Sequence, residues 1–298
     1  MEIGRGEFLP KIADRPAGVD MNQFKGLKNE DTFSERSIAF DKNKILEKRE
    51  EFTINHSENR FGYKGGDALE SVLDKWANLS GWFGGESVLI KASEFEDYFN
   101  GVDFYLEFKG QNQDDLKKRV ILAIDATSAV DNSKLIGKID SAVYKVTTRG
   151  GVDIKYYKSA IDGSMGYLKG AIPIVIGVDH NHADDFQIHA GENNFFRNHP
   201  DQVSFLEEIN LQLDYYLTLE IADEMRTKIE EAKKIMSQVW EEKKGLKKIV
   251  EDKTASELNY YVENKTRERK IISESKREEI KTVGKKVSLP YGIKPTKK

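Results

Sequence analysis

Two apolar runs separated by one short polar stretch constrain the fold of this chain more than any other feature. Val102–Phe108 and Val120–Ala126 each read as a strand, and the charged segment Gly110–Lys118 lies between them. Because strands joined by so short a connection pair antiparallel, the sequence predicts a hairpin-type pair here. Asp103 and Asp125 interrupt these runs. An ionised carboxylate is costly to bury unless it is paired or binds a metal, and a divalent metal is the explanation that this pattern favours.

The segments around this pair predict a mixed sheet with helices packed on it. Apolar residues at helical spacing predict a helix over Gly66–Leu79, and a good amino-terminal cap precedes a second helix over Lys134–Val146. Three further strands and one acidic, solvated connection are expected: the strands at Ser87–Ala92, Asp153–Tyr157 and Ile172–Val178, and the connection at Glu94–Tyr98. This order of elements is typical of the α/β (α+β) class.

Helical segments dominate the carboxy-terminal part of the sequence. Val203–Val250 has apolar residues at helical spacing and no internal proline, and Thr254–Val283 continues with weaker apolar content. We therefore expect a long carboxy-terminal helical appendage. The expected divisions are a partly ordered amino-terminal arm at 1–60 with a short helix near Lys44–Phe52, a core at 61–200, long helical segments at 201–284 and a basic tail at 285–298.

The charge of the chain is unevenly distributed, although its net charge is only −4. Residues 225–298 contain 21 Lys and Arg against 12 Asp and Glu, a balance of +9, which leaves 26 against 39, or −13, for residues 1–224. A basic helical segment can follow the phosphates of a nucleic acid, whereas alternating charge on a long helix equally suits a solvated surface. The chain has no cysteine, which excludes disulfides and thiolate metal sites. Without an apolar run that suits a secretory signal or a membrane span, we expect a cytoplasmic protein with no membrane partner.

Three short motifs follow a helix that carries a glutamate. The motifs are Asn-Gly-Val-Asp, ending at Asp103, Ile-Asp-Ala-Thr, around Asp125, and the apolar run Ile172–Val178. In order and spacing they resemble the PD-(D/E)XK nuclease-like superfamily over roughly Gly66–Val178, and they are similar to a bacterial branch of it. The resemblance implies a restriction-endonuclease-like core that hydrolyses phosphodiester bonds with Mg²⁺ or Mn²⁺ as cofactor.

The resemblance also implies a role for individual residues. Asp103 and Asp125 would bind the metal ion, and the backbone carbonyl of Ala126 would supply a third oxygen. Glu70, on the first helix, would orient water or a second ion. Hard divalent cations prefer such oxygen ligands and polarise the phosphoryl group during hydrolysis.

The lysine of the motif is missing from its usual place. The superfamily has lysine two residues after the second acid, where this chain has Thr127. The following helix offers Lys134 and Lys138, four residues apart, and Lys145 seven residues beyond Lys138, so all three share one face. We expect Lys138 to supply the positive charge, although a solvated helix face explains any single lysine equally well.

Other polar residues have simpler explanations. Glu70 also suits the amino terminus of its helix through the macrodipole. Glu107 lies in phase with the first acid along its strand, and we place it outside the site. A transition metal would suit His180, His182 and His189 with their neighbouring aspartates, but a polar loop accounts for the same residues and is the interpretation we favour.

Two functions from different classes remain open. The first is a metal-dependent nuclease-like protein that acts on DNA or RNA, as an endo- or exonuclease. Its phosphate contacts are expected at Lys134, Lys243, Lys244, Lys247, Lys248, Arg267, Arg269 and Lys270. In the alternative, the core is catalytically inert and the carboxy-terminal helices form a coiled coil or helical module. That module would mediate self-association or partner binding, as in a structural or assembly protein of a mobile element. Metal binding at Asp103 and Asp125 separates the two.

Overall fold

The structure is a computed structural model that describes residues 18–27, 31–55, 68–109, 116, 119–128, 132–178, 186, 189, 193–197 and 199–253. The chain divides into two units, Met1–Leu246 and Lys247–Lys298. Of the second unit, the structure describes only the end of one helix, at residues 247–253. The fold described below is that of the first unit.

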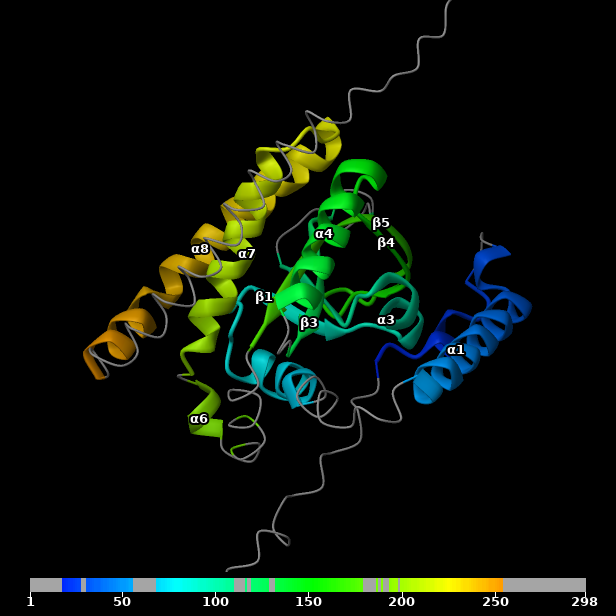
Figure 1. The fold of residues 1–298 in the computed structure, drawn as a ribbon, viewed down its shortest axis with the longest axis horizontal. Helices are drawn as coiled ribbons and strands as arrows, with labels where there is room; N and C mark the ends of the chain where they lie inside the picture. The colour runs from blue at the N-terminus through cyan, green and yellow to red at the C-terminus, as the bar shows by residue number, and fades with distance from the viewer. Residues whose placement is uncertain are drawn as a thin grey trace, which may run out of the picture. The chain divides into compact units, whose positions relative to one another are not determined.

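Five strands form one mixed sheet in the order β1-β2-β3-β5-β4 (Figure 1). The strands are β1 (Ser87–Lys91), β2 (Phe104–Phe108), β3 (Ile121–Thr127), β4 (Val152–Lys158) and β5 (Met165–Gly177). All neighbours pair antiparallel except β3 and β5, which are parallel. A parallel pair needs a crossover connection, which here contains the helix α4 (Asn132–Arg149). The predicted mixed sheet flanked by helices, with β2 and β3 as an antiparallel pair, is confirmed.

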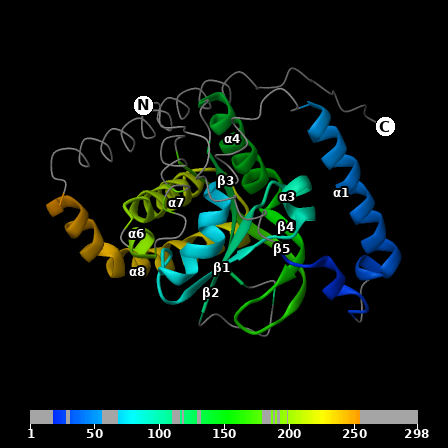
Figure 2. The ribbon, with the colours of Figure 1, turned by 90° about the horizontal axis from the view of Figure 1, so that it is seen from below.

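The other helical elements surround this sheet. They are η1 (Met21–Phe24), η2 (Asp31–Phe33), α1 (Glu35–Asn55), the π-helical turn η3 (Leu73–Ala77) within the helix of residues 68–79, α3 (Glu94–Asn100), α6 (Asn193–Arg197), α7 (Asp201–Leu217) and α8 (Asp223–Lys253). Helices α7 and α8 lie side by side (Figures 1 and 2) and are linked by an ion pair between Asp214 and Lys233. No helix in the described parts of the chain has the length and apolar content needed to cross a bilayer.

Side chains from alternate strand positions fill two different parts of the core. Phe104 and Leu106 of β2 pack with the helix of residues 68–79, α7 and α8. Tyr105, between them, packs with Ile121 of β3 and with residues of β4. All five residues of β2 are buried because both faces of the sheet are covered. A strand covered on both faces is apolar on both sides, and β2 is so except at Glu107.

Helix α7 covers the part of β5 that lies beyond its pairing with β4. Three side chains spaced four apart on α7 bind three residues spaced two apart on β5: Glu208 with Gly177, Gln212 with Val175, and Tyr216 with Pro173. The spacings match because four helical residues rise roughly 6 Å and two strand residues roughly 6.6 Å. Gln212 accepts from the Val175 N–H at 2.8 Å and donates to the Val175 carbonyl at 2.7 Å. Its amide therefore does what a neighbouring strand would do.

Polar side chains also bind the backbone of the two edge strands, β1 and β4. On β1, the Asn78 side chain accepts from the Leu89 N–H at 2.8 Å and donates to the Leu89 carbonyl at 2.7 Å. On β4, Oε1 of Glu96 accepts from the N–H groups of Lys155 and Tyr156, at 2.7 and 3.1 Å. Unpaired backbone groups at a strand edge can pair with another chain, and these side chains occupy some of them.

The segment expected to be a solvated acidic loop is the helix α3, so that prediction is wrong. Its amino terminus is capped by the Ser93 hydroxyl, which accepts from the Glu96 N–H at 3.4 Å. Its carboxy terminus ends at Gly101 in the left-handed region, with a φ of 60°. Glu96 is fully buried rather than solvated. Ser-x-x-Glu followed by glycine is a helix start and stop signal, and it outweighs the acidic composition.

Two other helices differ from the predicted boundaries. Helix α1 runs over Glu35–Asn55, well beyond the short helix expected near Lys44–Phe52, and its apolar residues pack in a small cluster with Phe24 and Tyr156. The stretch predicted to be helical throughout Val203–Val250 is divided into α7 and α8. The guanidinium of Arg226 donates to the carbonyls of Leu217 and Leu219, which satisfies the end of α7 at this break.

Candidate functional site

Asp103 lies immediately before β2, beside the segment of β3 that carries Asp125. Its N–H donates to the Ile124 carbonyl at 2.9 Å, and its Oδ2 accepts from the Ala126 N–H at 2.8 Å. The antiparallel pairing of β2 and β3 therefore brings the two predicted acids together from distant parts of the sequence. Ala126 contacts the site through its N–H, and the role of its carbonyl oxygen as a metal ligand stays a prediction.

Glu70 approaches this region from the helix of residues 68–79, where it forms a buried ion pair. Its Oε2 lies 2.6 Å from Nζ of Lys91, and the two side chains are only 8% and 6% exposed. The Lys91 ammonium also lies 4.6 Å from the ring centroid of Phe104. A favourable interaction of Glu70 with its helix macrodipole does not require a buried cation. The buried pair with Lys91 therefore needs another explanation, since removing either ion would leave the other uncompensated.

Two lysines of α4 lie close to Asp125. Nζ of Lys138 forms an ion pair with Oδ1 of Asp125, so the expectation that this amine faces Asp125 is confirmed. Nζ of Lys145 donates to the Asn100 carbonyl at 2.6 Å. A side-chain carbon at Gly101 would lie 3.8 Å from Oδ2 of Asp125 and 3.9 Å from Nζ of Lys145, so these two groups face the same small space. Lys138 of α4 thus supplies a positive charge near Asp125, which Thr127 does not.

The charges of this cluster act on one another. Burial raises the pKa of Asp103 well above its usual range; the charge of Glu70 raises it further, Lys91 opposes this, and Asp125 adds to the increase. Burial also raises the pKa of Asp125, against the opposing charge of Lys138. Carboxylates that repel one another in a poorly solvated site are stabilised by an added cation. Carboxylate oxygens are donors that Mg²⁺ accepts, and the metal site itself stays a prediction.

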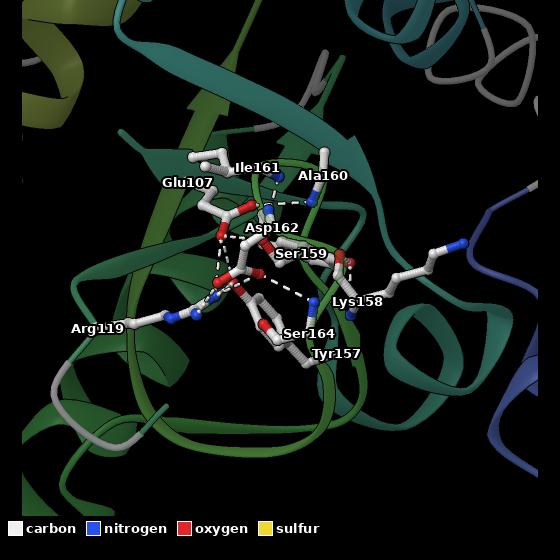
Figure 3. Close-up of polar contacts among 10 residues, drawn as sticks. Glu107, Arg119, Tyr157, Lys158, Ser159, Ala160, Ile161, Asp162 and Ser164 are labelled. Carbon is white, nitrogen blue, oxygen red and sulfur yellow. Dashed lines mark hydrogen bonds and ion pairs between the residues drawn. The ribbon is translucent and has the colours of Figure 1, made fainter. Parts of the chain in front are cut away.

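Glu107 belongs to a separate buried network that joins β2 to β4 and the turn before β5 (Figure 3). Its Oε1 accepts from the hydroxyls of Tyr157 and Ser159, at 2.7 and 2.6 Å, and from Arg119 at 3.3 Å. The guanidinium of Arg119 also pairs with Asp162. Because its carboxylate is held by these partners, Glu107 has a structural role. This agrees with its placement outside the candidate site.

The predicted phosphate-binding residues are described only in part. Lys134 lies in the first turn of α4. On α8, Nζ of the half-buried Lys243 donates to Oε1 of Gln202 at 3.1 Å, and burial lowers the pKa of Lys243. This contact makes Lys243 part of the packing of α8 on α7, and its phosphate contact stays a prediction. For Lys244, Lys247 and Lys248 the structure describes the helical backbone but not the side chains. The remaining three predicted residues, Arg267, Arg269 and Lys270, lie outside the described residues.

Of the three histidines considered as transition-metal ligands, the described residues include His189. His180 and His182 lie outside them. The ring of His189 stacks on Phe195, with centroids 4.1 Å apart. Within the described residues, no three or more His, Asp or Glu side chains stand together as a ready-made metal-binding group.

Sequence reasoning missed Lys91, the partner of Glu70. Lys91 ends the apolar run of β1, as Asp103 begins that of β2, so the signal was a charged residue at a strand end. Such a position does not by itself show which opposite charge lies nearby, because Glu70 comes from a different element. Asp97 was also assigned to a solvated loop, but its charge raises the pKa of both Asp103 and Asp125.

Comparisons with known proteins add no relative: no family model matches the sequence, and neither a curated protein nor a solved structure gives a significant match.

Proposed function

We propose that this chain is a metal-dependent nuclease of the PD-(D/E)XK type, which hydrolyses phosphodiester bonds in nucleic acid. The observation that carries the proposal is the backbone pairing that sets Asp103 beside the part of β3 that carries Asp125. Glu70 and Asp125 both act electrostatically on Asp103, and Lys138 forms an ion pair with Asp125. Perturbed acids gathered with lysines favour a functional site over a purely structural one.

The order of the core elements also supports the proposal. The helix of residues 68–79 is followed by β1, α3, the antiparallel pair β2 and β3, the crossover helix α4, β4, and β5, which is parallel to β3. A restriction-endonuclease-like core would have this order with α3 and the edge strand β4 as additions. The acids lie at the start of β2 and near the end of β3, where a hairpin brings them side by side.

The residues present suit Mg²⁺ or Mn²⁺, which one or two carboxylates bind together with waters and substrate phosphate. Asp103 and Asp125 would hold the ion. Bound there, it would polarise the phosphoryl oxygen and lower the pKa of an attached water. Glu70, which is paired with Lys91, would orient that water. Lys138 keeps a positive charge next to Asp125, where it can stabilise negative charge that develops on the phosphate.

The face of α4 that holds Lys138 against Asp125 carries further cations. Lys134, Lys138, Lys145 and Arg149 fall within about 60° of one another at 100° per residue. Tyr144 borders this face, is 53% exposed and has the Arg149 guanidinium 5.5 Å from its ring centroid. Cations in a row with an exposed aromatic ring are the groups that bind phosphates and stack on bases.

The proposal is tested by incubating the full chain with end-labelled single- and double-stranded DNA and RNA, with Mg²⁺, with Mn²⁺ and with excess chelator. We expect cleavage that needs the cation and that Asp125→Asn abolishes, because the amide keeps the volume but loses the charge. The matched control is Asp140→Asn, which makes the same change at an exposed position of α4 and should retain activity.

Cleavage that persists in chelator, or equally in Asp125→Asn, would overturn the proposal. An absence of cleavage with every substrate would favour the inert-core alternative. That alternative predicts that the full chain forms an oligomer, which light scattering measures.

A further inference from the structure

The carboxy-terminal half of α4 presents an exposed aromatic ring beside two cations. Tyr144 is 53% exposed, and the guanidinium of Arg149 lies 5.5 Å from the centroid of its ring. Lys145 follows Tyr144 in the chain and is half-buried. Burial lowers the pKa of Lys145, Asp125 opposes this, and the nearby charges of Arg149 and Lys138 lower it further. The ring and the two cations therefore lie close together, next to one of the candidate acids.

Both cations have hydrogen-bond donors that the chain does not use. In the described part of the chain, Lys145 forms one hydrogen bond, to the Asn100 carbonyl at 2.6 Å. Within the same residues, the guanidinium of Arg149 forms no hydrogen bond or ion pair. An ammonium has three N–H donors and a guanidinium five. Lys138, by contrast, is held in its ion pair with Asp125. Of these three cations, Lys145 and Arg149 thus remain available to an anion.

The charge of α4 contrasts with that of the sequence around it. Four cations and one acid, Asp140, give α4 a balance of +3. Residues 1–224 as a whole have 26 cations against 39 acids, or −13. A nucleic acid is therefore attracted by one narrow basic element and repelled by the acidic charge elsewhere. A DNA duplex carries one negative charge per about 1.7 Å of its axis, twice the density of one of its strands. A single strand thus suits so narrow a row of cations better than a duplex.

The exposed ring also favours bases whose faces are free. In a duplex each base is stacked between its neighbours, so a protein side chain cannot stack on it. An unpaired strand can place a base on an aromatic ring while neighbouring cations bind its phosphates. Lys145 faces the same small space as Oδ2 of Asp125, beside Gly101. A strand held on α4 would therefore have a phosphodiester bond close to the candidate acids.

We propose that the surface formed by Tyr144, Lys145 and Arg149 binds single-stranded nucleic acid, with a base stacked on Tyr144 and the adjoining phosphates at the two cations. The inference rests on the proposed nuclease function and names its substrate class, an unpaired strand of DNA or RNA.

Helix α1 offers a comparison within the same chain. Phe40 is 59% exposed, and Nζ of Lys44 lies 4.6 Å from the centroid of its ring. Helix α1 has five cations and five acids, however, so it lacks the net positive charge of α4. An exposed ring with one cation is thus present on both helices, and only α4 adds the charge that attracts phosphates. Phe40 is therefore a matched control for Tyr144.

The direct test measures binding of labelled oligonucleotides of about 12 nucleotides to the full chain by fluorescence anisotropy, in excess chelator so that metal-dependent cleavage does not interfere. The probes are single-stranded DNA, single-stranded RNA, a DNA duplex and an abasic DNA strand. We expect one or both single strands to bind at least about tenfold more tightly than the duplex.

The variants show whether base stacking on Tyr144 causes this preference. Tyr144→Ala should weaken binding of the single strand by about fivefold to 150-fold, the loss of one stacked base. Tyr144→Phe, which keeps the ring, and Phe40→Ala, which removes the ring on α1, should bind as the unaltered chain does. The abasic strand should bind equally to Tyr144→Ala and to the unaltered chain, because it has no base to stack.

Equal or tighter binding of the duplex, no measurable binding of either single strand, or equal affinity in Tyr144→Ala and Phe40→Ala would overturn the inference. So would a loss in Tyr144→Ala that persists with the abasic strand. The cleavage assay separates this failure from that of the proposed function. Cleavage that Asp125→Asn abolishes but that is as fast on a duplex and in Tyr144→Ala would leave the nuclease intact and remove the single-strand surface. Base-dependent binding at Tyr144 without any cleavage would keep the surface and reject the nuclease.

Discussion

Replacing Gln212 with methionine tests the interpretation that α7 acts as a substitute strand for β5. The change keeps the length of the side chain but removes both hydrogen bonds to Val175, which is 4% exposed. The Val175 N–H and carbonyl would each lose their partner. An unsatisfied buried polar group costs about 1–3 kcal/mol, and the partial exposure of Gln212 lets water recover some of it. We expect Gln212→Met to lower the free energy of unfolding by about 2–4 kcal/mol.

Urea denaturation of the full chain measures this loss, and hydrogen exchange of the Val175 amide shows whether it is local. The matched control is Gln238→Met, at an exposed position of α8, which should change stability by less than about 0.5 kcal/mol. Equal unfolding free energies for the two variants would refute the reasoning. So would an unchanged exchange rate at Val175, because the amide would then be protected by something other than Gln212.

Three further predictions concern buried charges. Burial raises the pKa of Glu96 to about 7, so its contribution to stability is fully present below its ordinary value of 4.5 and is lost as the pH rises through about 7. Glu96→Gln should therefore flatten the dependence of the denaturation midpoint on pH across that window. Arg119→Met leaves the Glu107 carboxylate without its cation and should cost about 3–5 kcal/mol in urea denaturation. Lys91→Met should destabilise the chain more than the double change with Glu70→Gln, because the double change removes the uncompensated charge; additive losses in denaturation would contradict this.

The parts of the fold predicted correctly are those that local patterns specify. The length of the connection between the runs around Asp103 and Asp125 is enough to predict an antiparallel pair, and helical spacing is enough to put Lys138 on one face of its helix with Lys134 and Lys145. The acids at strand ends followed from the cost of burying a charge. None of these inferences required knowledge of how distant elements pack.

The features that sequence reasoning missed depend on such packing. Lys91 pairs with Glu70 because the helix of residues 68–79 packs against β1. Glu96 is buried because its carboxylate satisfies the backbone of β4, a need that appears only once β4 is an edge strand. The length of α1 likewise depends on its packing with Phe24 and Tyr156, whereas polar composition suggested a partly ordered arm with a short helix. Helix α3 is different. Its capping residues are visible in the sequence, but its acidic composition led us to predict a solvated loop.

The central claim, that Asp103 and Asp125 form a divalent metal site, is tested most directly by measuring Mn²⁺ binding to the full chain with electron paramagnetic resonance. We expect one bound Mn²⁺ per chain, displaced by Mg²⁺, and at least about tenfold weaker binding in Asp103→Asn and in Asp125→Asn, because each loses a hard, charged oxygen ligand. Asp140→Asn should bind as the unaltered chain does. Equal Mn²⁺ affinity in all four proteins, or no binding by the unaltered chain, would contradict the account.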